Sequence, residues 1–226
     1  MLNSKSNGKE EIKIKRLDQD IIPEKDKLIS YKIIILGNSG VGKSCLLKRA
    51  VQGKFAENYE ATIGFELLLM YYEINGVKIK LQIWDTCGQE MYRSLVQGFY
   101  RNTALTLLIY AINDLKSFDD LLDWLNDIKI NTAANMPIFL IGNKFDLKDD
   151  VKVKFQTAKD FAKQNNFVYF NEASAKTGYN TDDIFPEISK YLYKEYYLKG
   201  KNEDKKTKMK LGQNEDNKRN KKRKCC

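Results

Sequence analysis

The sequence predicts an α/β fold in which a mostly parallel sheet carries helices on both faces. Three observations lead to this prediction. Short apolar runs typical of buried strands alternate with amphipathic stretches typical of helices. A glycine-rich loop at residues 37–44 joins the first such run to the first such helix. Asn75-Gly76, between two apolar runs, is a pair that type I′ hairpins prefer, so one strand is expected to run antiparallel to the others.

The expected elements occupy residues 31–198. Six strands are expected, at residues 31–36, 65–74, 77–84, 105–112, 138–141 and 168–170. Four helices are expected, at residues 43–51, 117–130, 154–164 and 181–197, with Ser117 and Thr181 as N-caps. We therefore expect one domain at 31–198, a polar N-terminal extension at 1–30 and a flexible tail at 199–226.

The positive charge of the chain lies almost entirely in its last 28 residues. The 226 residues carry a net charge of +9, to which residues 199–226 contribute +8 and residues 1–30 contribute +1, so residues 31–198 are neutral overall. Few large apolar side chains accompany the charge in the tail, which indicates disorder there. Such a tail suits an anionic membrane surface, a nucleic acid or plain solvation, and its charge alone does not choose between them.

Composition excludes several classes of site. The chain has no histidine, which excludes a Ser-His-Asp triad and histidine-ligated zinc. Its four cysteines form no CxxC pair, so we do not expect a disulfide framework. We expect the protein to lie in a reducing compartment. No apolar run approaches the ~20 residues of a membrane-spanning helix. The first 30 residues contain no apolar segment like that of a secretory signal.

Residues 37–44, Gly-Asn-Ser-Gly-Val-Gly-Lys-Ser, match the pattern GxxxxGK[ST] of a phosphate-binding loop. They lie between an expected strand and an expected helix, which is the context that the pattern requires. The backbone N–H groups of this loop would face phosphate oxygens, Lys43 would reach the β- and γ-phosphates, and the Ser44 hydroxyl would bind Mg²⁺. Nucleotide binding is therefore the first functional prediction.

Two further loops contain residues suited to a guanine nucleotide. Residues 143–146, Asn-Lys-Phe-Asp, follow an expected strand. The Asp146 carboxylate can accept hydrogen bonds from guanine N1–H and the 2-amino group, a pair of donors that adenine lacks. Asp85 follows the hairpin, where an aspartate would hold Mg²⁺. Beyond it, the N–H group of Gly88 would approach the γ-phosphate and Gln89 would orient the attacking water, so GTP hydrolysis is predicted.

The chain resembles the Ras superfamily of small GTPases, and within it the Rab family. The resemblance covers about residues 30–198 and rests on five motifs: GNSGVGKS at 37–44, TIG at 62–64, WDTCGQE at 84–90, NKFD at 143–146 and SAK at 174–176. It implies the fold of P-loop NTPases, Mg²⁺ and GTP or GDP as cofactors, and slow GTP hydrolysis that an activating protein accelerates. The segments at 80–85 and 99–102 favour the Rab family.

The resemblance assigns roles to single residues. The expected phosphate-binding residues are Ser39, Gly40, Val41, Gly42, Lys43, Ser44, Cys45 and Gly88. The expected guanine-binding residues are Phe55, Asn143, Lys144, Asp146, Ser174, Ala175 and Lys176. The expected catalytic residues are Lys43, Thr62 and Gln89, and the expected Mg²⁺ ligands are Ser44, Thr62 and Asp85. The expected switch and effector residues are Tyr59, Ile63, Leu67, Trp84 and Phe99, with Leu67 standing where Rab proteins usually have phenylalanine.

The chain ends in Cys225-Cys226, which in Rab proteins is doubly geranylgeranylated. Two lipid chains anchor a protein stably where one does not, and the basic tail adds attraction to anionic lipid. The resemblance therefore implies a monomeric regulator of vesicle trafficking at the cytoplasmic face of an intracellular membrane, cycling with the cytosol. Its implied partners are an exchange factor, a GTPase-activating protein, a GDP-dissociation inhibitor or escort protein, and effectors, without nucleic acid.

Two other functions stay open on the sequence alone. A nucleic-acid-associated GTPase would use the basic tail on phosphates, although the neutral domain and the terminal cysteines argue against it. A degenerate switch would bind nucleotide without hydrolysing it, although every expected catalytic position is filled. Retention on RNA would favour the first, and absence of GTP turnover would favour the second.

Overall fold

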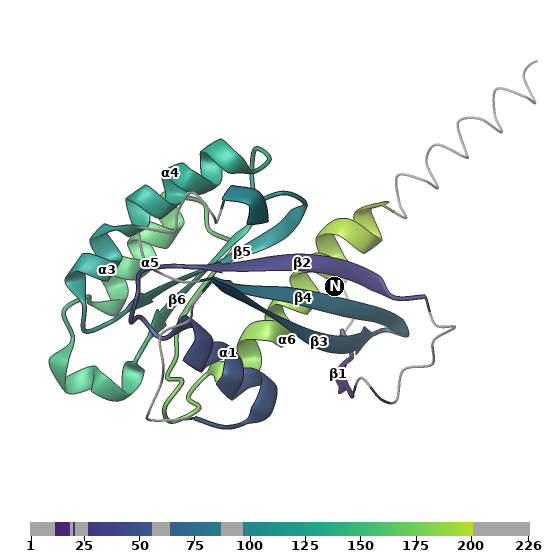
Figure 1. The fold of residues 1–226 in the computed structure, drawn as a ribbon, viewed down its shortest axis with the longest axis horizontal. Helices are drawn as coiled ribbons and strands as arrows, with labels where there is room; N and C mark the ends of the chain where they lie inside the picture. The colour runs from purple at the N-terminus through teal and green to yellow at the C-terminus, as the bar shows by residue number, and fades with distance from the viewer. Residues whose placement is uncertain (1–11, 19, 21–26, 56–63, 87–96, 201–226) are drawn as a thin grey trace, which may run out of the picture.

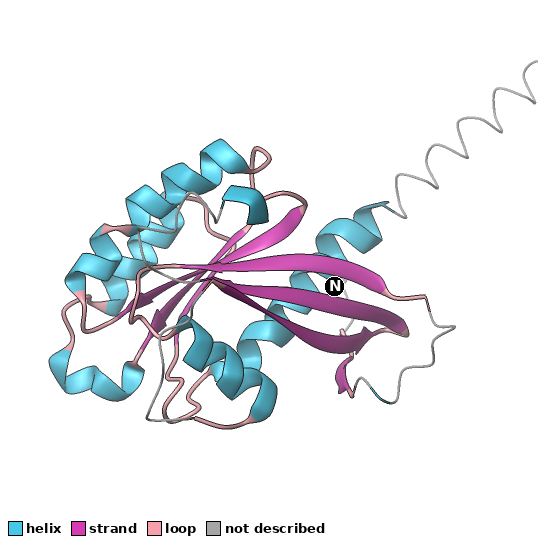
Figure 2. Cartoon of the chain, in the orientation of Figure 1, coloured by secondary structure: helices cyan, strands magenta, loops and turns pink. Residues whose placement is uncertain are grey.

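The computed structural model describes residues 12–18, 20, 27–55, 64–86 and 97–200. This part of the chain forms one seven-stranded sheet with helices on both faces (Figure 1, Figure 2). The strands are β1 (Ile14–Leu17), β2 (Ile29–Leu36), β3 (Phe65–Ile74), β4 (Val77–Thr86), β5 (Thr103–Ala111), β6 (Ile138–Asn143) and β7 (Tyr169–Glu172). The α-helices are α1 (Lys43–Gln52), α3 (Leu115–Asp119), α4 (Leu121–Asn131), α5 (Phe155–Gln164) and α6 (Thr181–Leu192). Short 3₁₀ helices cover Gln97–Phe99 and Phe145–Asp150, and a π-helix covers Tyr193–Leu198.

The strands are arranged in the order β1-β3-β4-β2-β5-β6-β7. β4, β2, β5, β6 and β7 run parallel, and β3 runs against them in a hairpin with β4. The two turn residues of this hairpin, Asn75 and Gly76, have φ angles of 48° and 78°, and a type I′ turn requires positive φ at both. The predicted fold class, a mostly parallel α/β sheet of the P-loop NTPase kind, is confirmed.

The sheet contains seven described strands, not the six that the sequence analysis predicted. The additional strand, β1, lies within residues 1–30 and pairs antiparallel with β3, with Ile14 opposite Ile74. Ile12 and Ile14 alternate with lysines, as the side chains of a half-buried strand do, and both pack against the core. The alternation is short and lies among charged residues, which is why composition alone suggested a polar extension.

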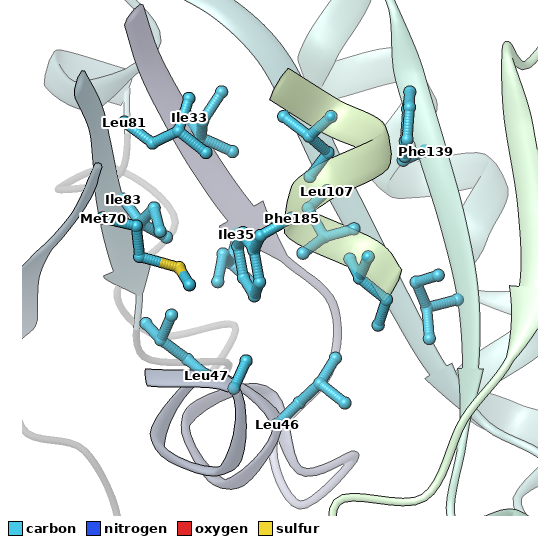
Figure 3. Packing of buried hydrophobic residues seen from close by; sticks show 14 of the residues in the cluster. Ile33, Ile35, Leu46, Leu47, Met70, Leu81, Ile83, Leu107, Phe139 and Phe185 are labelled. Atoms are coloured by element: carbon cyan, nitrogen blue, oxygen red, sulfur yellow. The ribbon is translucent and has the colours of Figure 1, made fainter. Parts of the chain in front are cut away.

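Each face of the sheet has its own apolar core. Successive side chains of a strand point to opposite faces, so Ile35 of β2 joins the core under α1 and α6 whereas Ile34 joins the core under α4 and α5. Figure 3 shows the first core, where Ile35 lies beside Phe185 of α6 and near Leu47 of α1. These two helices are thereby held against the same strand. Within the described residues, no helix combines the length and the apolarity needed to cross a bilayer.

The helix expected at 117–130 is divided into α3 and α4 at Asp120. The N-cap of α3 is Asp114, whose Oδ1 accepts a hydrogen bond of 3.2 Å from the Ser117 N–H group. Ser117 is buried inside α3 and donates its hydroxyl to the Asp114 carbonyl, so the prediction of Ser117 as N-cap is wrong. Thr181 is the first residue of α6 and not its cap, because Asn180 holds the cap position.

Asp114→Ala removes the cap of α3 without disturbing a buried side chain. We expect the free energy of unfolding to fall by about 1 kcal/mol, because the first-turn N–H group of Ser117 loses its acceptor. Urea denaturation measures the change. Asp119→Ala, at an exposed position of the same helix, is the control and should change the unfolding free energy by less than about 0.5 kcal/mol. Equal losses in both variants would contradict the capping role.

Candidate nucleotide-binding site

The loops singled out in the sequence meet at one edge of the sheet. The phosphate-type loop at 37–44 follows β2, Asp85 lies near the end of β4, residues 143–146 span the end of β6, and residues 174–176 follow β7. These four strands are parallel, so their carboxyl ends share an edge. β2 lies between β4 and β5: the strands that come next along the chain, β3 and β4, are added on one side of β2, and β5 to β7 are added on the other. Ligands of open α/β sheets bind at such a switch point.

Two glycines allow the loop at 37–44 to lie against its neighbours. Gly37 has a φ angle of 136°, and a Cβ atom there would lie 2.1 Å from the Ile109 carbonyl oxygen of β5. Gly42 has a φ angle of 91°, and its Cβ would lie 2.5 Å from the Asn143 side-chain nitrogen. Gly42 is also the N-cap of α1 and has no side chain to occupy the first-turn N–H groups. That helix end therefore suits an anion.

Lys43, the first residue of α1, is folded back across the loop. Its ammonium group donates hydrogen bonds of 2.8 Å and 2.9 Å to the carbonyl oxygens of Gly37 and Asn38, and the residue is 6% exposed. A buried positive charge is thus fixed in the concave part of the loop. It is suited to binding phosphate oxygens there.

Asp85 and Ser44 supply oxygen atoms that fit a Mg²⁺ ion. Asp85 is fully buried, and neither carboxylate oxygen accepts a well-formed hydrogen bond from any described residue. Burial raises the pKa of this carboxyl group to about 6, and the nearby Ser44 hydroxyl and Lys43 ammonium act against the increase. A cation would offset the cost of this buried charge. Mg²⁺ bound there would neutralise part of the phosphate charge, with Ser44 and Asp85 holding it.

The Asn143 side chain joins three of the loops. Its amide nitrogen donates hydrogen bonds of 2.8 Å to the Val41 carbonyl and 3.3 Å to the Gly42 carbonyl. Its amide oxygen accepts a hydrogen bond of 3.1 Å from the Ala175 N–H group. The residue is 1% exposed. The structure shows Asn143 holding the phosphate loop against the loop that follows β7. The contact with the guanine base that the sequence analysis assigned to Asn143 stays a prediction.

Asp146 is oriented by the same neighbouring loop. Its Oδ1 accepts a hydrogen bond of 2.5 Å from the Ser174 hydroxyl, which itself accepts one of 3.1 Å from the Thr177 N–H group. Phe145 is held beside it by stacking on Tyr179, with ring centroids 4.6 Å apart and planes within 16°. The half-buried carboxylate therefore has a fixed direction, which is what recognition of two adjacent guanine donors requires.

The remaining predicted residues divide into those the structure describes and those it does not. Ser39, Gly40 and Lys176 are exposed at the edge of the site, Val41 is buried, and Phe55 packs partly buried against the core under α1 and α6. Cys45 is half-buried, and burial raises the pKa of its thiol. Lys144 adopts a φ angle of 67°. Outside the described residues lie Tyr59, Thr62, Ile63, Gly88, Gln89, Cys225 and Cys226, whose roles stay predictions.

Arg49 on α1 is a site residue that the sequence analysis missed. Its Nε donates a hydrogen bond of 2.9 Å to the Ala175 carbonyl, and its Nη2 donates to the Lys176 carbonyl. Its Nη1 donates one of 2.9 Å to the Gly53 carbonyl just beyond the helix. Arg49 thus ties α1 to the loop after β7. Because Ala175 and Lys176 are more than 120 residues away from Arg49, no local sequence pattern predicts these two contacts.

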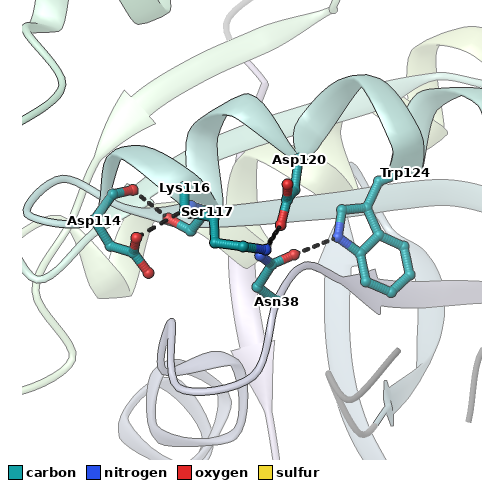
Figure 4. Close-up of polar contacts among 6 residues, drawn as sticks. All are labelled: Asn38, Asp114, Lys116, Ser117, Asp120 and Trp124. Atoms are coloured by element: carbon teal, nitrogen blue, oxygen red, sulfur yellow. Dashed lines mark hydrogen bonds and ion pairs between the residues drawn. The ribbon is translucent and has the colours of Figure 1, made fainter. Parts of the chain in front are cut away.

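Asn38, inside the phosphate loop, is likewise part of an unpredicted network (Figure 4). Its amide nitrogen donates a hydrogen bond of 2.6 Å to Asp120, and its amide oxygen accepts one of 2.9 Å from the Trp124 indole. Asp120 also accepts a hydrogen bond of 2.7 Å from Lys116. The phosphate loop is therefore fixed to the junction of α3 and α4. The residue that fixes it, Asn38, occupies a position of the pattern GxxxxGK[ST] at which any residue is allowed.

An aromatic cluster is formed by β3, β4 and the 3₁₀ helix Gln97–Phe99. The rings of Phe65, Trp84 and Phe99 have centroids 4.5 Å to 5.4 Å apart, and the Lys32 ammonium lies 5.1 Å from the Trp84 ring centroid. Phe65 is 53% exposed. Leu67, which the sequence analysis selected for this surface, lies opposite Trp84 on the same face of β3, and its role stays a prediction. Phe65, two residues earlier on that face, adds ring contacts that the sequence analysis did not select. We refer to Phe65, Trp84 and Phe99 as the aromatic cluster.

Asn143→Ala tests how the loops are held together. The change removes both donated hydrogen bonds and leaves the buried Ala175 N–H group without its acceptor. We expect the free energy of unfolding to fall by about 2–4 kcal/mol, measured by urea denaturation. Asn126→Ala, on the exposed face of α4, is the control and should stay within about 0.5 kcal/mol of the wild type. A loss below about 1 kcal/mol for Asn143→Ala would contradict the assignment.

Asp85→Asn tests the Mg²⁺ site. An amide in place of the buried carboxylate no longer offsets the charge of a divalent cation, so Mg²⁺ should bind about tenfold or more weakly. The readout is the release rate of fluorescently labelled GDP at increasing Mg²⁺ concentration. Mg²⁺ slows the release of GDP, and the Mg²⁺ concentration that gives half of this effect should be higher for the variant than for the wild type. Asp123→Asn, exposed on α4, should behave as the wild type, and an unchanged Mg²⁺ requirement for Asp85→Asn would contradict the site.

Comparison with known protein families agrees with this geometry. The model of the Ras family matches residues 32–194, which include every described loop of the site. Members of this family bind GTP and GDP, and the residues at 37–44, 85, 143–146 and 174–176, which the sequence analysis predicted to bind phosphate, Mg²⁺ and guanine, lie at one sheet edge. The chain therefore belongs to the Ras family and is a GTP-binding switch protein with GTPase activity.

Proposed function

We propose that this Ras-family protein is a Rab-type switch, anchored to the cytoplasmic face of an intracellular membrane, that regulates vesicle trafficking. The observation that carries the proposal is the pair Cys225-Cys226 at the end of a tail with net charge +8. Two prenyl chains on this pair supply stable anchoring, and the basic tail adds attraction to anionic lipid. The protein cycles with the cytosol when a GDP-dissociation inhibitor or escort protein covers the lipids.

The switching step follows from the charge arrangement of the site. Lys43 and the loop N–H groups stabilise the negative charge that develops on the γ-phosphate, and Gln89 orients the attacking water. Intrinsic hydrolysis is slow, and a GTPase-activating protein accelerates it. Loss of the γ-phosphate releases contacts that had ordered the segments around Thr62 and Gln89. An exchange factor then replaces GDP with GTP.

The aromatic cluster is the surface on which an effector would read the nucleotide state. Phe65 lies three residues after Thr62 in the sequence, and Trp84 lies five residues before Gln89. A partner that contacts the cluster would therefore bind close in sequence to both nucleotide-dependent segments. An exposed phenylalanine and two half-buried aromatic rings beside a lysine suit the centre of a protein interface.

The double change Cys225→Ser and Cys226→Ser tests the anchor. Without thiols no prenyl group attaches, and the basic tail alone gives only weak, salt-sensitive attraction to lipid. In fractionated cells we expect the variant in the cytosol and the wild type mostly with membranes. Asn220→Ser in the same tail is the control and should leave membrane association unchanged.

GDP binding should be equal in all three proteins, which separates loss of anchoring from loss of folding. Membrane association that persists in the double variant would refute lipid anchoring. Cytosolic wild-type protein retained on RNA in a salt-dependent way would favour the nucleic-acid-associated alternative.

A further inference from the structure

The carboxyl end of α1 is held by a residue from the N-terminal strand. Arg16 of β1 donates hydrogen bonds of 2.7 Å from Nη1 to the Ala50 carbonyl and 2.8 Å from Nη2 to the Val51 carbonyl. The last carbonyls of a helix lack partners within the helix, and a cation is favourable there. Both terminal nitrogens of the Arg16 guanidinium group thus bind the end of α1. Their acceptors, Ala50 and Val51, lie 34 and 35 residues further along the chain.

Helix α1 connects that end to both halves of the nucleotide site. Its first turn supplies Lys43 and Ser44, the residues predicted to bind the phosphates and Mg²⁺. Its last turn supplies Arg49, which donates hydrogen bonds to the carbonyls of Ala175 and Lys176. These two residues belong to the loop that follows β7, residues 174–176, which we call the guanine loop. A ten-residue helix moves largely as one body. A displacement of its carboxyl end would therefore also displace the residues that contact the phosphate loop and the loop at 174–176.

A pocket of about 200 Å³ that is partly open to solvent lies beside the carboxyl end of α1, between β1, β3 and α6. Its lining includes Arg16, Ala50, Tyr72 and Phe185. Arg16 therefore contacts the end of α1 at the rim of this pocket, and its two hydrogen bonds join β1 to that end of the helix.

We propose that Arg16 is a positioning residue for nucleotide retention, which acts by holding the carboxyl end of α1 so that the phosphate loop and the guanine loop stay in their binding arrangement. The proposal rests on guanine-nucleotide binding by the Ras family and not on the membrane function proposed above. A pre-ordered site loses bound ligand more slowly, so the effect falls on the release rate. It gives the N-terminal strand a role in setting how long GDP stays bound.

The test measures release of fluorescently labelled GDP from the full-length protein, chased with excess unlabelled GTP in the presence of Mg²⁺. Arg16→Ala should release GDP about fivefold faster or more, which is the lower range of couplings between distant sites. Lys15→Ala is the matched control, because it removes the same charge from the adjacent, exposed position of β1. Its release rate should stay within about twofold of the wild type.

Two further variants separate positioning from general destabilisation. Arg16→Lys keeps the charge but lacks the fork that reaches two carbonyls, so its release rate should lie between those of wild type and Arg16→Ala. Ile128→Val trims a buried side chain of α4 on the opposite face of the sheet and should cost about 1 kcal/mol of stability without touching α1. Its GDP release should match the wild type.

The proposal is overturned by either of two results. One is a release rate for Arg16→Ala within about twofold of the wild type. The other is an equal acceleration in Ile128→Val at an equal decrease in thermal midpoint, which would mean that release follows global stability. Failure of every variant to bind GDP, the wild type included, would instead refute nucleotide binding itself.

Discussion

The amide of Asn143 is the contact on which the geometry of the site depends. The sheet brings the ends of β2, β6 and β7 to one edge, but it leaves the loops beyond them free to separate. A carboxamide has donors on one atom and an acceptor on the other, so one buried side chain binds carbonyls of the phosphate loop and an N–H group of the guanine loop together. An aspartate there would lose the donors and face two carbonyl oxygens. Gly42 is required for the same reason, because a side chain would displace the amide.

The site also contains a buried carboxylate whose charge the protein offsets only in part. Neither oxygen of Asp85 accepts a well-formed hydrogen bond from a described residue, and burial raises its pKa although the Lys43 ammonium and the Ser44 hydroxyl act against the increase. A bound Mg²⁺ would offset this charge further, so binding would add to the stability of the fold. Deviations from good local pairing are expected at functional sites. Here the deviation lies at the carboxyl end of β4, beside the phosphate loop.

Much of the fold and the identity of the site loops are accessible from the sequence, because buried parallel strands are continuous apolar runs and phosphate loops need glycine at fixed positions. What the sequence did not reveal is set by contacts between distant residues. Arg49 and Asn38 contact partners more than 80 residues away. The ring contacts of Phe65 were also not predicted, because they depend on how Trp84 and Phe99 pack against β3 and not on a local pattern. β1 was missed because a four-residue strand gives little periodic signal.

Helix α1 explains why the two halves of the site should respond together. Gly42 and Lys43 fix its start to the phosphate loop, Arg49 fixes its last turn to the guanine loop, and Arg16 fixes its end to the sheet. A rigid element under three such constraints has few intermediate positions, because a shift that breaks one contact strains the others. Elements of this kind move between discrete arrangements and not along a continuum. We therefore expect the length of time that nucleotide stays bound to depend on the whole helix, including Arg16, which contacts the end of α1 away from the phosphate loop.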